Sequence, residues 1–235
     1  MKYIATGRVH PERANVNFPA IEWNIPEKGR VVVNCDSSQI SVSMDLSTID
    51  GWATAYNVAG NFASMIIGAL GFSLGSGYSI EITQVIKEDG TPLVFGVRQY
   101  AENPTRTLGF DPFIPIFTRA FNLSNHDIFF RLALIDFLRA INDVNDCAMY
   151  CYRAIESIKS AFVFASGNDS WDEMHLALGS DKNTIESKIK SFADPIRHGN
   201  WVNAKVTDGK TRWEMLEITK DILWKYLNLK IPEEV

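Results

Sequence analysis

The stretch RVVVNCDSSQISVSMDL, residues 30–46, decides the first half of the fold. It contains two short runs rich in Val and Ile, Arg30 to Cys35 and Ile40 to Leu46, separated by Asp and Ser. Such runs bounded by turn-forming residues are typical of β-strands. A third run, Lys2 to Val9, has the same character. The sequence therefore predicts three strands before residue 47.

A helix is expected after these strands, because apolar residues from Trp52 to Leu70 recur at three- and four-residue steps, the period of an α-helix. Asp50 offers an N-cap for it. Two further strands, Tyr78 to Ile86 and Leu93 to Val97, flank an Asp-Gly pair that favours a tight turn. Residues 1–100 are thus predicted to form an antiparallel or mixed sheet with one covering helix.

Residues 101–123 are expected to be a connector rich in Pro and aromatic residues, because the steps before Pro104, Pro112 and Pro115 bias the chain away from helix. Residues 124–235 then show helical periodicity, with Ser124 or Asn125 as the first N-cap. Helices are predicted over 128–138, 143–164, a short segment after 170, 182–193 and 212–227. Short connections favour antiparallel neighbours, so the prediction is an up-and-down bundle and an α+β chain overall.

Composition narrows the classes of function. The net charge of -5 argues against a sequence-blind nucleic-acid coat, which needs many Lys and Arg. Three cysteines, Cys35, Cys147 and Cys151, follow no zinc pattern and suggest structural thiols in a reducing compartment, so a cytoplasmic location is expected. Residues 51–80 lack charge, but their Asn, Ser and Gly favour a buried helix over a membrane span.

The most informative segment for function is Ser191 to Asn200, SFADPIRHGN. Pro195 suits the first turn of a helix, so Asp194 is expected to cap a new turn that Gly199 ends in the left-handed conformation. Asp194 lies four residues before His198 and can fix the imidazole tautomer, while Arg197 can hold a phosphate. Equally, His198 and Asp194 can simply complement the two helix ends.

This segment resembles the HEPN superfamily, the higher eukaryotes and prokaryotes nucleotide-binding helical domains, which carry Arg-Asn-x-x-x-His in a small bundle. The resemblance covers about residues 124–230. It places His198 on the family histidine and Asp194 on its Asn, but Ala193 stands in the slot of the arginine. The resemblance implies a homodimer formed through the helical domain, in which arginine and histidine of both protomers face one cleft and cleave RNA without a metal.

Because a cation is missing at residue 193, Arg197 is the expected substitute, with Lys190 second. Three functions stay open. The preferred one is an RNA-, nucleotide- or partner-binding module of a prokaryotic defence or toxin-type system with little or no catalysis. The others are a ribonuclease that uses His198, Arg197 and Asp194, and a structural dimerisation protein. No cofactor or metal is expected, and a protein partner of the N-terminal domain is conceivable.

Overall fold

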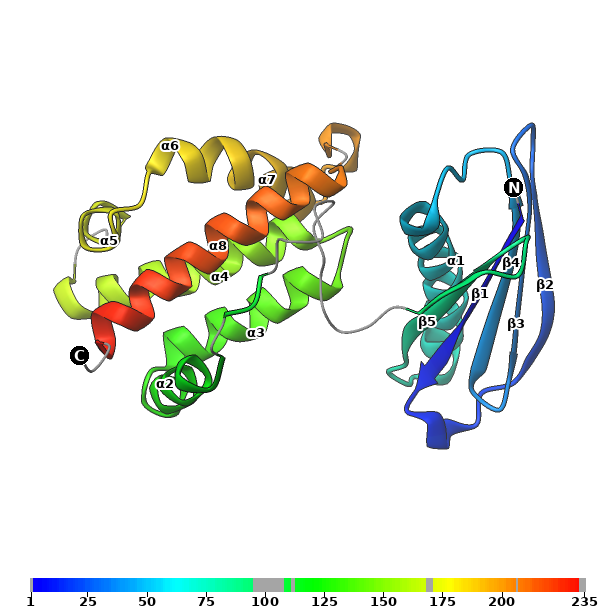
Figure 1. Ribbon diagram of the computed structural model, residues 1–235, viewed down its shortest axis with the longest axis horizontal. Coiled ribbons are helices and arrows are strands. Elements are labelled where there is room, and N and C mark those ends of the chain that lie inside the picture. Colours follow the sequence, from blue (N-terminus) through cyan, green and yellow to red (C-terminus); the bar gives the residue numbers. More distant parts are fainter. Residues whose placement is uncertain (1, 95–107, 111–112, 168–170, 206, 233–235) are drawn as a thin grey trace. The chain divides into compact units, whose positions relative to one another are not determined.

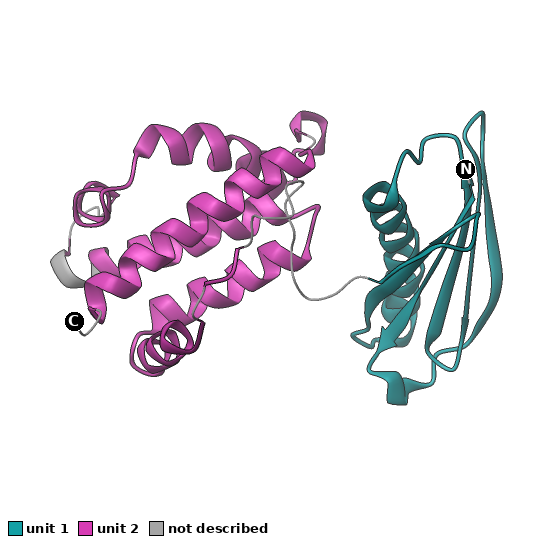
Figure 2. Cartoon of the chain, viewed as in Figure 1, with its two compact units in different colours: residues 1–97 teal, residues 98–235 magenta. Residues whose placement is uncertain are grey.

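The computed structural model describes residues 2–94, 108–110, 113–167, 171–205 and 207–232. The chain divides into two compact units, residues 1–97 and 98–235, which we call the sheet unit and the helical unit (Figure 2). In the described part of the chain, the sheet unit contains an antiparallel sheet with one α-helix, and the helical unit is all-helical (Figure 1). The predicted α+β class is confirmed.

Within residues 2–94 the sheet has six strands in the order β2-β3-β4-β1-β5-β6, and every neighbouring pair is antiparallel. Side chains alternate between its two faces, as the strand period requires. The helix side of the sheet forms one continuous core that includes Ala5, Val33 and Val42. The strands are β1 (Lys2–His10), β2 (Phe18–Ile25), β3 (Gly29–Asp36), β4 (Gln39–Leu46), β5 (Ser79–Lys87) and β6 (Pro92–Val94).

Strand β2 was absent from the sequence prediction. It is an edge strand whose residues are half-buried or exposed, so it lacks the apolar run of a central strand. Pro19 lies within it, and proline is tolerated at a sheet edge because its missing N–H breaks no ladder. The predicted hairpin between β5 and β6 is present, with Gly90 at φ 83° in its turn. Residues 95–97 of the predicted last strand lie outside the described residues.

Helix α1 (Trp52–Leu74) covers one face of the sheet with a row of small buried residues at four-residue steps, Ala55, Ala59 and Ala63. The sequence favoured a buried helix, but only the side that faces the sheet is buried and the other side is exposed, with Phe72 at 92%. Among the described residues it is also the helix long and apolar enough to cross a membrane by length and composition. The N-cap is Gly51 instead of the predicted Asp50.

The helical unit is built around α3, α4 and α8, which pack on one another and share one apolar core. Its helices are α2 (Phe113–His126), α3 (Ile128–Asn142), α4 (Cys147–Ser166), α5 (Trp171–Leu178), α6 (Lys182–Ile185), the π-helical η2 (Glu186–Lys190), α7 (Ser191–Arg197) and α8 (Gly209–Lys230). The helical unit also contains a short 3-10 turn, η3 (Trp201–Asn203), and the sheet unit contains another, η1 (Glu12–Ala14).

The predicted connector is wrong for residues 113–123, which form α2. Pro115 is the third residue of that helix, where an N–H has no acceptor within the helix, so proline does no harm there. The N-cap of α3 is Asp127, whose carboxylate accepts from the N–H of Phe129 and Phe130. Ser124, one of the two predicted caps, instead donates its hydroxyl to the carbonyl of Ala120 at 2.6 Å. Residues 101–107 and 111–112 of the connector lie outside the described residues.

Candidate functional site

The predicted site lies at the end of α7, but the local backbone differs from the prediction. Asp194 is not an N-cap: it lies inside α7 together with Pro195. Proline costs little there because the helix ends two residues later and a single backbone hydrogen bond is lost. Gly199 has φ 65° and its N–H donates to the carbonyl of Ile196 at 3.1 Å. The predicted left-handed stop at Gly199 is confirmed.

Two of the three predicted site residues come together. The Nη1 atom of Arg197 lies 3.3 Å from Oε1 of Glu156 and 3.8 Å from Oδ1 of Asp194. Its guanidinium also lies over the ring of Tyr152, 5.2 Å from the centroid. Asp194 therefore orients Arg197 instead of the imidazole. The pKa of Tyr152 is raised to about 12 by burial first and then by Glu156.

His198 is exposed at the C-cap of α7, and no hydrogen bond or ion pair joins its ring to another described residue. Ala193, the slot of the arginine in the resembled motif, is fully buried in the helical core. A guanidinium at that position would point into apolar packing. Arg197 is thus ion-paired to carboxylates, and the helical core leaves no room for a guanidinium at residue 193.

A second group of polar residues, missed by the sequence analysis, lies next to Arg197. Asp136 is buried, and its Oδ1 lies 3.3 Å from Nη1 of Arg139 and 3.3 Å from Nη2 of Arg153. Both guanidiniums lie over Tyr150, at 5.9 and 5.7 Å from its ring centroid. A carboxylate on the inward side of α3, between Ala133 and Ala140 on the helical period, was the signal that could have revealed this cluster.

A surface groove of about 220 Å³ runs along this cluster between α3 and α4. We call it the Asp136 groove; it is lined by Leu132, Asp136, Arg153, Glu156, Ser157 and Ser160. Arg153 lines the groove itself, whereas Arg139 and Arg197 are ion-paired to two of its lining carboxylates, Asp136 and Glu156. We refer to these three residues as the arginine cluster.

The arginine cluster retains hydrogen-bond donors. Each guanidinium carries five N–H groups, and an ion pair to one carboxylate oxygen leaves several for a further anion. The side chains of Arg139, Arg153 and Arg197 are 53%, 44% and 31% exposed. Carboxylates and tyrosine rings hold the planar groups in place, which suits them to bidentate recognition of phosphate.

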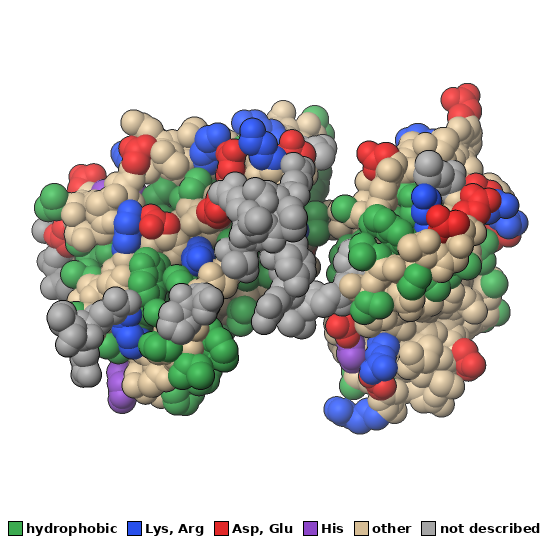
Figure 3. Space-filling model, in the orientation of Figure 1, with side chains coloured by type: hydrophobic (Ala, Val, Ile, Leu, Met, Phe, Trp, Pro, Cys, Tyr) green, Lys and Arg blue, Asp and Glu red, His purple; other side chains and the backbone are tan. Residues whose placement is uncertain are grey.

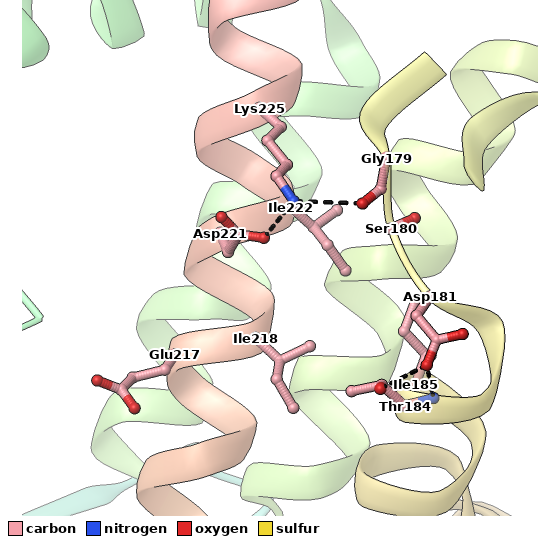
Figure 4. A pocket seen from close by; sticks show the side chains of 10 residues that line it. All are labelled: Gly179, Ser180, Asp181, Thr184, Ile185, Glu217, Ile218, Asp221, Ile222 and Lys225. Carbon is pink, nitrogen blue, oxygen red and sulfur yellow. Dashed lines mark hydrogen bonds and ion pairs between the residues drawn. The ribbon is translucent and has the colours of Figure 1, made fainter. Parts of the chain in front are cut away.

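A larger hollow of about 310 Å³ lies between α8 and the segment that leads into α6 (Figure 4). Its floor is apolar, formed by Ile185, Ile218 and Ile222, which point toward its centre. The polar contacts of its lining residues are with the protein itself: Lys225 Nζ lies 2.7 Å from Asp221 Oδ2, and Asp181 caps α6. With three carboxylates and one amine on its rim, this hollow is a poor site for phosphate.

The other polar candidates have structural roles. Tyr226 donates its hydroxyl to Oδ2 of Asp127 at 2.6 Å, and burial together with that bond holds the pKa of Tyr226 well above the usual phenol value. His175 pairs with Ser180 through Nδ1 at 2.8 Å. All three cysteines are free and buried. Within the described residues no group of His, Cys, Asp and Glu could hold a metal ion.

These observations define a two-unit α+β protein whose helical unit bears a groove lined by Arg153, with Arg139 and Arg197 ion-paired to carboxylates of its lining. The chain belongs to the DUF8168 family, described as a domain of unknown function. The model of the family's N-terminal domain matches residues 3–95, and that of its C-terminal domain matches residues 114–231. No curated protein and no solved structure matches the chain. Neither family description mentions HEPN domains, so that resemblance stays a prediction.

Proposed function

We propose that the helical unit binds RNA or a nucleotide through its phosphate groups at the arginine cluster, and that it does so with little or no catalysis. One observation carries this proposal. Arg153 lines the Asp136 groove, and Arg139 and Arg197 are ion-paired to carboxylates of its lining, Asp136 and Glu156. Each of the three guanidiniums also lies over a tyrosine ring.

Preorganisation is the physical basis of the proposed affinity. An exposed arginine side chain loses about 2 kcal/mol of rotamer freedom when it is immobilised by a ligand. The side chains of the arginine cluster are already ordered by Asp136, Glu156 and Asp194, so a ligand meets less of that cost. Each charge-assisted hydrogen bond to phosphate then contributes roughly 1.5–3 kcal/mol.

The charge balance sets the size of the ligand contact. The arginine cluster faces three carboxylates, so the groove is not a strongly positive surface. It can engage at most about three phosphates, and the dependence of single-stranded binding on salt should have a slope of about −2 or shallower. A nucleotide or a short single strand of RNA fits this balance of charges better than a long nucleic acid contacted through many phosphates.

Catalysis is left out of the proposal because of the geometry of Arg197 and His198. The guanidinium is oriented by Glu156 and Asp194, and no hydrogen bond to another described residue fixes the tautomer of the imidazole. General acid–base catalysis needs a group held within hydrogen-bond reach of the proton that it transfers. An RNA cleavage assay on wild type, His198→Ala and Arg197→Ala tests this point: cleavage that both changes abolish would establish the ribonuclease instead.

The binding proposal is tested by fluorescence anisotropy with a labelled single-stranded RNA and with a labelled nucleotide, each at two salt concentrations. We expect Arg139→Ala to weaken binding about 10-fold and Arg153→Lys to weaken it several-fold, because lysine keeps the charge beside Asp136 but loses the planar fork. Arg30→Ala, on the sheet and 58% exposed, is the matched control and should leave binding unchanged. Equal affinities for all four proteins, or binding indifferent to salt, would refute the proposal.

A further inference from the structure

Two cysteines lie one helical turn apart at the start of α4, outside the proposed binding site. Cys147 is the first residue of that helix, and Cys151 follows four residues later. Their Sγ atoms are 4.0 Å apart, and both side chains are fully buried in the core of the helical unit. The sequence favoured purely structural thiols, but this separation brings two of them within reach of a common reaction.

The position of Cys147 favours its thiolate form. A helix N-terminus and a neighbouring arginine both stabilise a thiolate, and the first residue of α4 has both. A hydrogen bond with Cys151 first, and the Arg212 guanidinium after it, lower the pKa of Cys147 against the effect of its burial. Burial raises the pKa of Cys151. The two thiols are therefore unequal: Cys147 is the nucleophile, and Cys151 keeps its proton.

Arg212 is held beside Cys147 from α8. Its guanidinium donates to the carbonyl oxygen of Ala140 at 3.5 Å and to that of Ile141, both at the end of α3. Surface charges such as those in Figure 3 are screened by water and salt, whereas Arg212 is half-buried. Its charge therefore acts on the neighbouring thiolate through a less polar medium.

We propose that Cys147 and Cys151 form a redox-active dithiol that hydrogen peroxide converts to a disulfide. In the first step the Cys147 thiolate attacks one peroxide oxygen and the O–O bond breaks. The leaving hydroxide takes up the proton that Cys147 released, which gives water and a sulfenic acid. In the second step the Cys151 sulfur attacks the Cys147 sulfur, the S–O bond breaks, and hydroxide leaves as water with the proton of Cys151. Each sulfur loses one electron, and the peroxide gains both.

The first turn of α4 can accommodate the bridge. Cα atoms four residues apart on a helix are separated by roughly 6 Å, and disulfides span up to about 6.8 Å. The sulfurs must close from 4.0 Å to about 2 Å, so the turn has to tighten. The first N–H groups of a helix have no acceptor within it, so few hydrogen bonds resist this change. One of them joins the N–H of Tyr150 to the carbonyl of Asp146 at 3.0 Å.

Burial of the pair determines how fast it reacts. Hydrogen peroxide is a small neutral molecule, and it reaches Cys147 once the first turn of α4 opens. Opening at a helix end needs far less free energy than global unfolding. Cys35 is the contrasting case: it is the one cysteine of residues 1–97, its thiol donates to the carbonyl of Val16 at 3.3 Å, and burial raises its pKa. We therefore expect the pair to react before Cys35.

Thiol trapping and mass spectrometry of the full chain test the proposal. The reduced protein is treated with hydrogen peroxide, denatured, alkylated with iodoacetamide and digested with trypsin, which releases both cysteines in one peptide, residues 140–153. We expect this peptide to lack both alkyl groups and to be lighter than its reduced form by two hydrogen atoms. Dithiothreitol should reverse the change. Cys35 should lose its reactivity toward iodoacetamide at least about tenfold more slowly than Cys147.

Two serine variants separate the two steps. Cys147→Ser should leave Cys151 fully alkylated after peroxide, because the nucleophile is gone. Cys151→Ser should stop at the sulfenic acid, which dimedone traps. Wild type that keeps all three thiols alkylatable after peroxide would overturn the proposal, as would wild type that loses Cys35 as fast as Cys147. The wild-type measurement decides by itself if a serine variant folds poorly.

A consequence at the arginine cluster rests on the proposed function. Tyr150 lies between the two cysteines in sequence, and the guanidiniums of Arg139 and Arg153 lie over its ring. Tightening the turn shifts this ring, so the oxidised protein should bind labelled RNA several-fold more weakly, whereas Cys147→Ser should bind equally before and after peroxide. Equal affinities of oxidised and reduced wild type would refute this coupling. The disulfide is measured without RNA, so a bridge in a protein that never binds RNA refutes the proposed function alone.

Discussion

The Asp136→Asn substitution is the sharpest test of the arginine cluster, because it keeps the shape of the side chain and removes its charge. The carboxylate is only 6% exposed and is shared by Arg139 and Arg153 at 3.3 Å each. Breaking a fully buried ion pair costs about 3–5 kcal/mol. Both arginines are about half exposed and remain solvated afterwards, so we expect the smaller loss of about 1–3 kcal/mol in the free energy of unfolding.

Urea unfolding measures this loss as a lower midpoint at an unchanged slope. Asp172→Asn, at an exposed carboxylate in the first turn of α5, is the control and should shift the midpoint far less. A double-mutant cycle with Arg153→Gln should show a coupling of about 1 kcal/mol or more, because the two side chains are in contact. An Asp136→Asn protein as stable as wild type, or a cycle that is simply additive, would refute the idea that this carboxylate orders the arginines.

Three further predictions concern the second half of the chain. Ala193→Arg should destabilise the protein by about 3 kcal/mol or more in urea, because residue 193 is fully buried; a stable, active variant would instead revive the resemblance to HEPN ribonucleases. Gly199→Ala should lower the free energy of unfolding by about 1 kcal/mol, because φ at Gly199 is 65° and alanine is strained in that conformation. An unchanged urea midpoint would contradict this role of Gly199 as the left-handed end of α7. Hydrogen bonds from Thr211 lower the pKa of Asp208, so the stability that this carboxylate contributes is present above its unfolded pKa and is lost as pH falls through the lower folded pKa. Asp208→Asn should therefore reduce the loss of stability at acid pH. A dependence of the free energy of unfolding on pH identical to that of wild type would argue against the cap.

Local patterns were enough to predict most elements of the fold. The Val- and Ile-rich runs at 30–35 and 40–46 lie in β3 and β4, and the row at Ala55, Ala59 and Ala63 forms the buried side of α1. The wrong predictions concern segments whose sequence pattern is compatible with two different local structures. Pro115 is compatible both with a connector and with the first turn of a helix, and Phe18–Ile25 forms an edge strand without a continuous apolar run.

The candidate site was harder to predict because it depends on contacts between helices far apart in sequence. Arg197 was found from its neighbourhood of Asp194 and His198, but its strongest partner is Glu156, 41 residues earlier. Helical periodicity places Arg153 and Glu156 one turn apart on α4; it does not say that α3 brings Asp136 and Arg139 beside them. The position of Asp136 on the inward side of α3 indicates that this carboxylate needs a partner, but the sequence does not say which residue that partner is.

The burial of Ala193 shows why a short motif cannot establish this chemistry. Residues 193 and 197 are one turn apart, so a motif read on a regular helix would place both near the same groove. The packing of α7 against α4 instead puts Ala193 in the core and leaves Arg197 at the surface beside Tyr152. The cations that accompany Arg197 therefore come from neighbouring helices, Arg139 from α3 and Arg153 from α4.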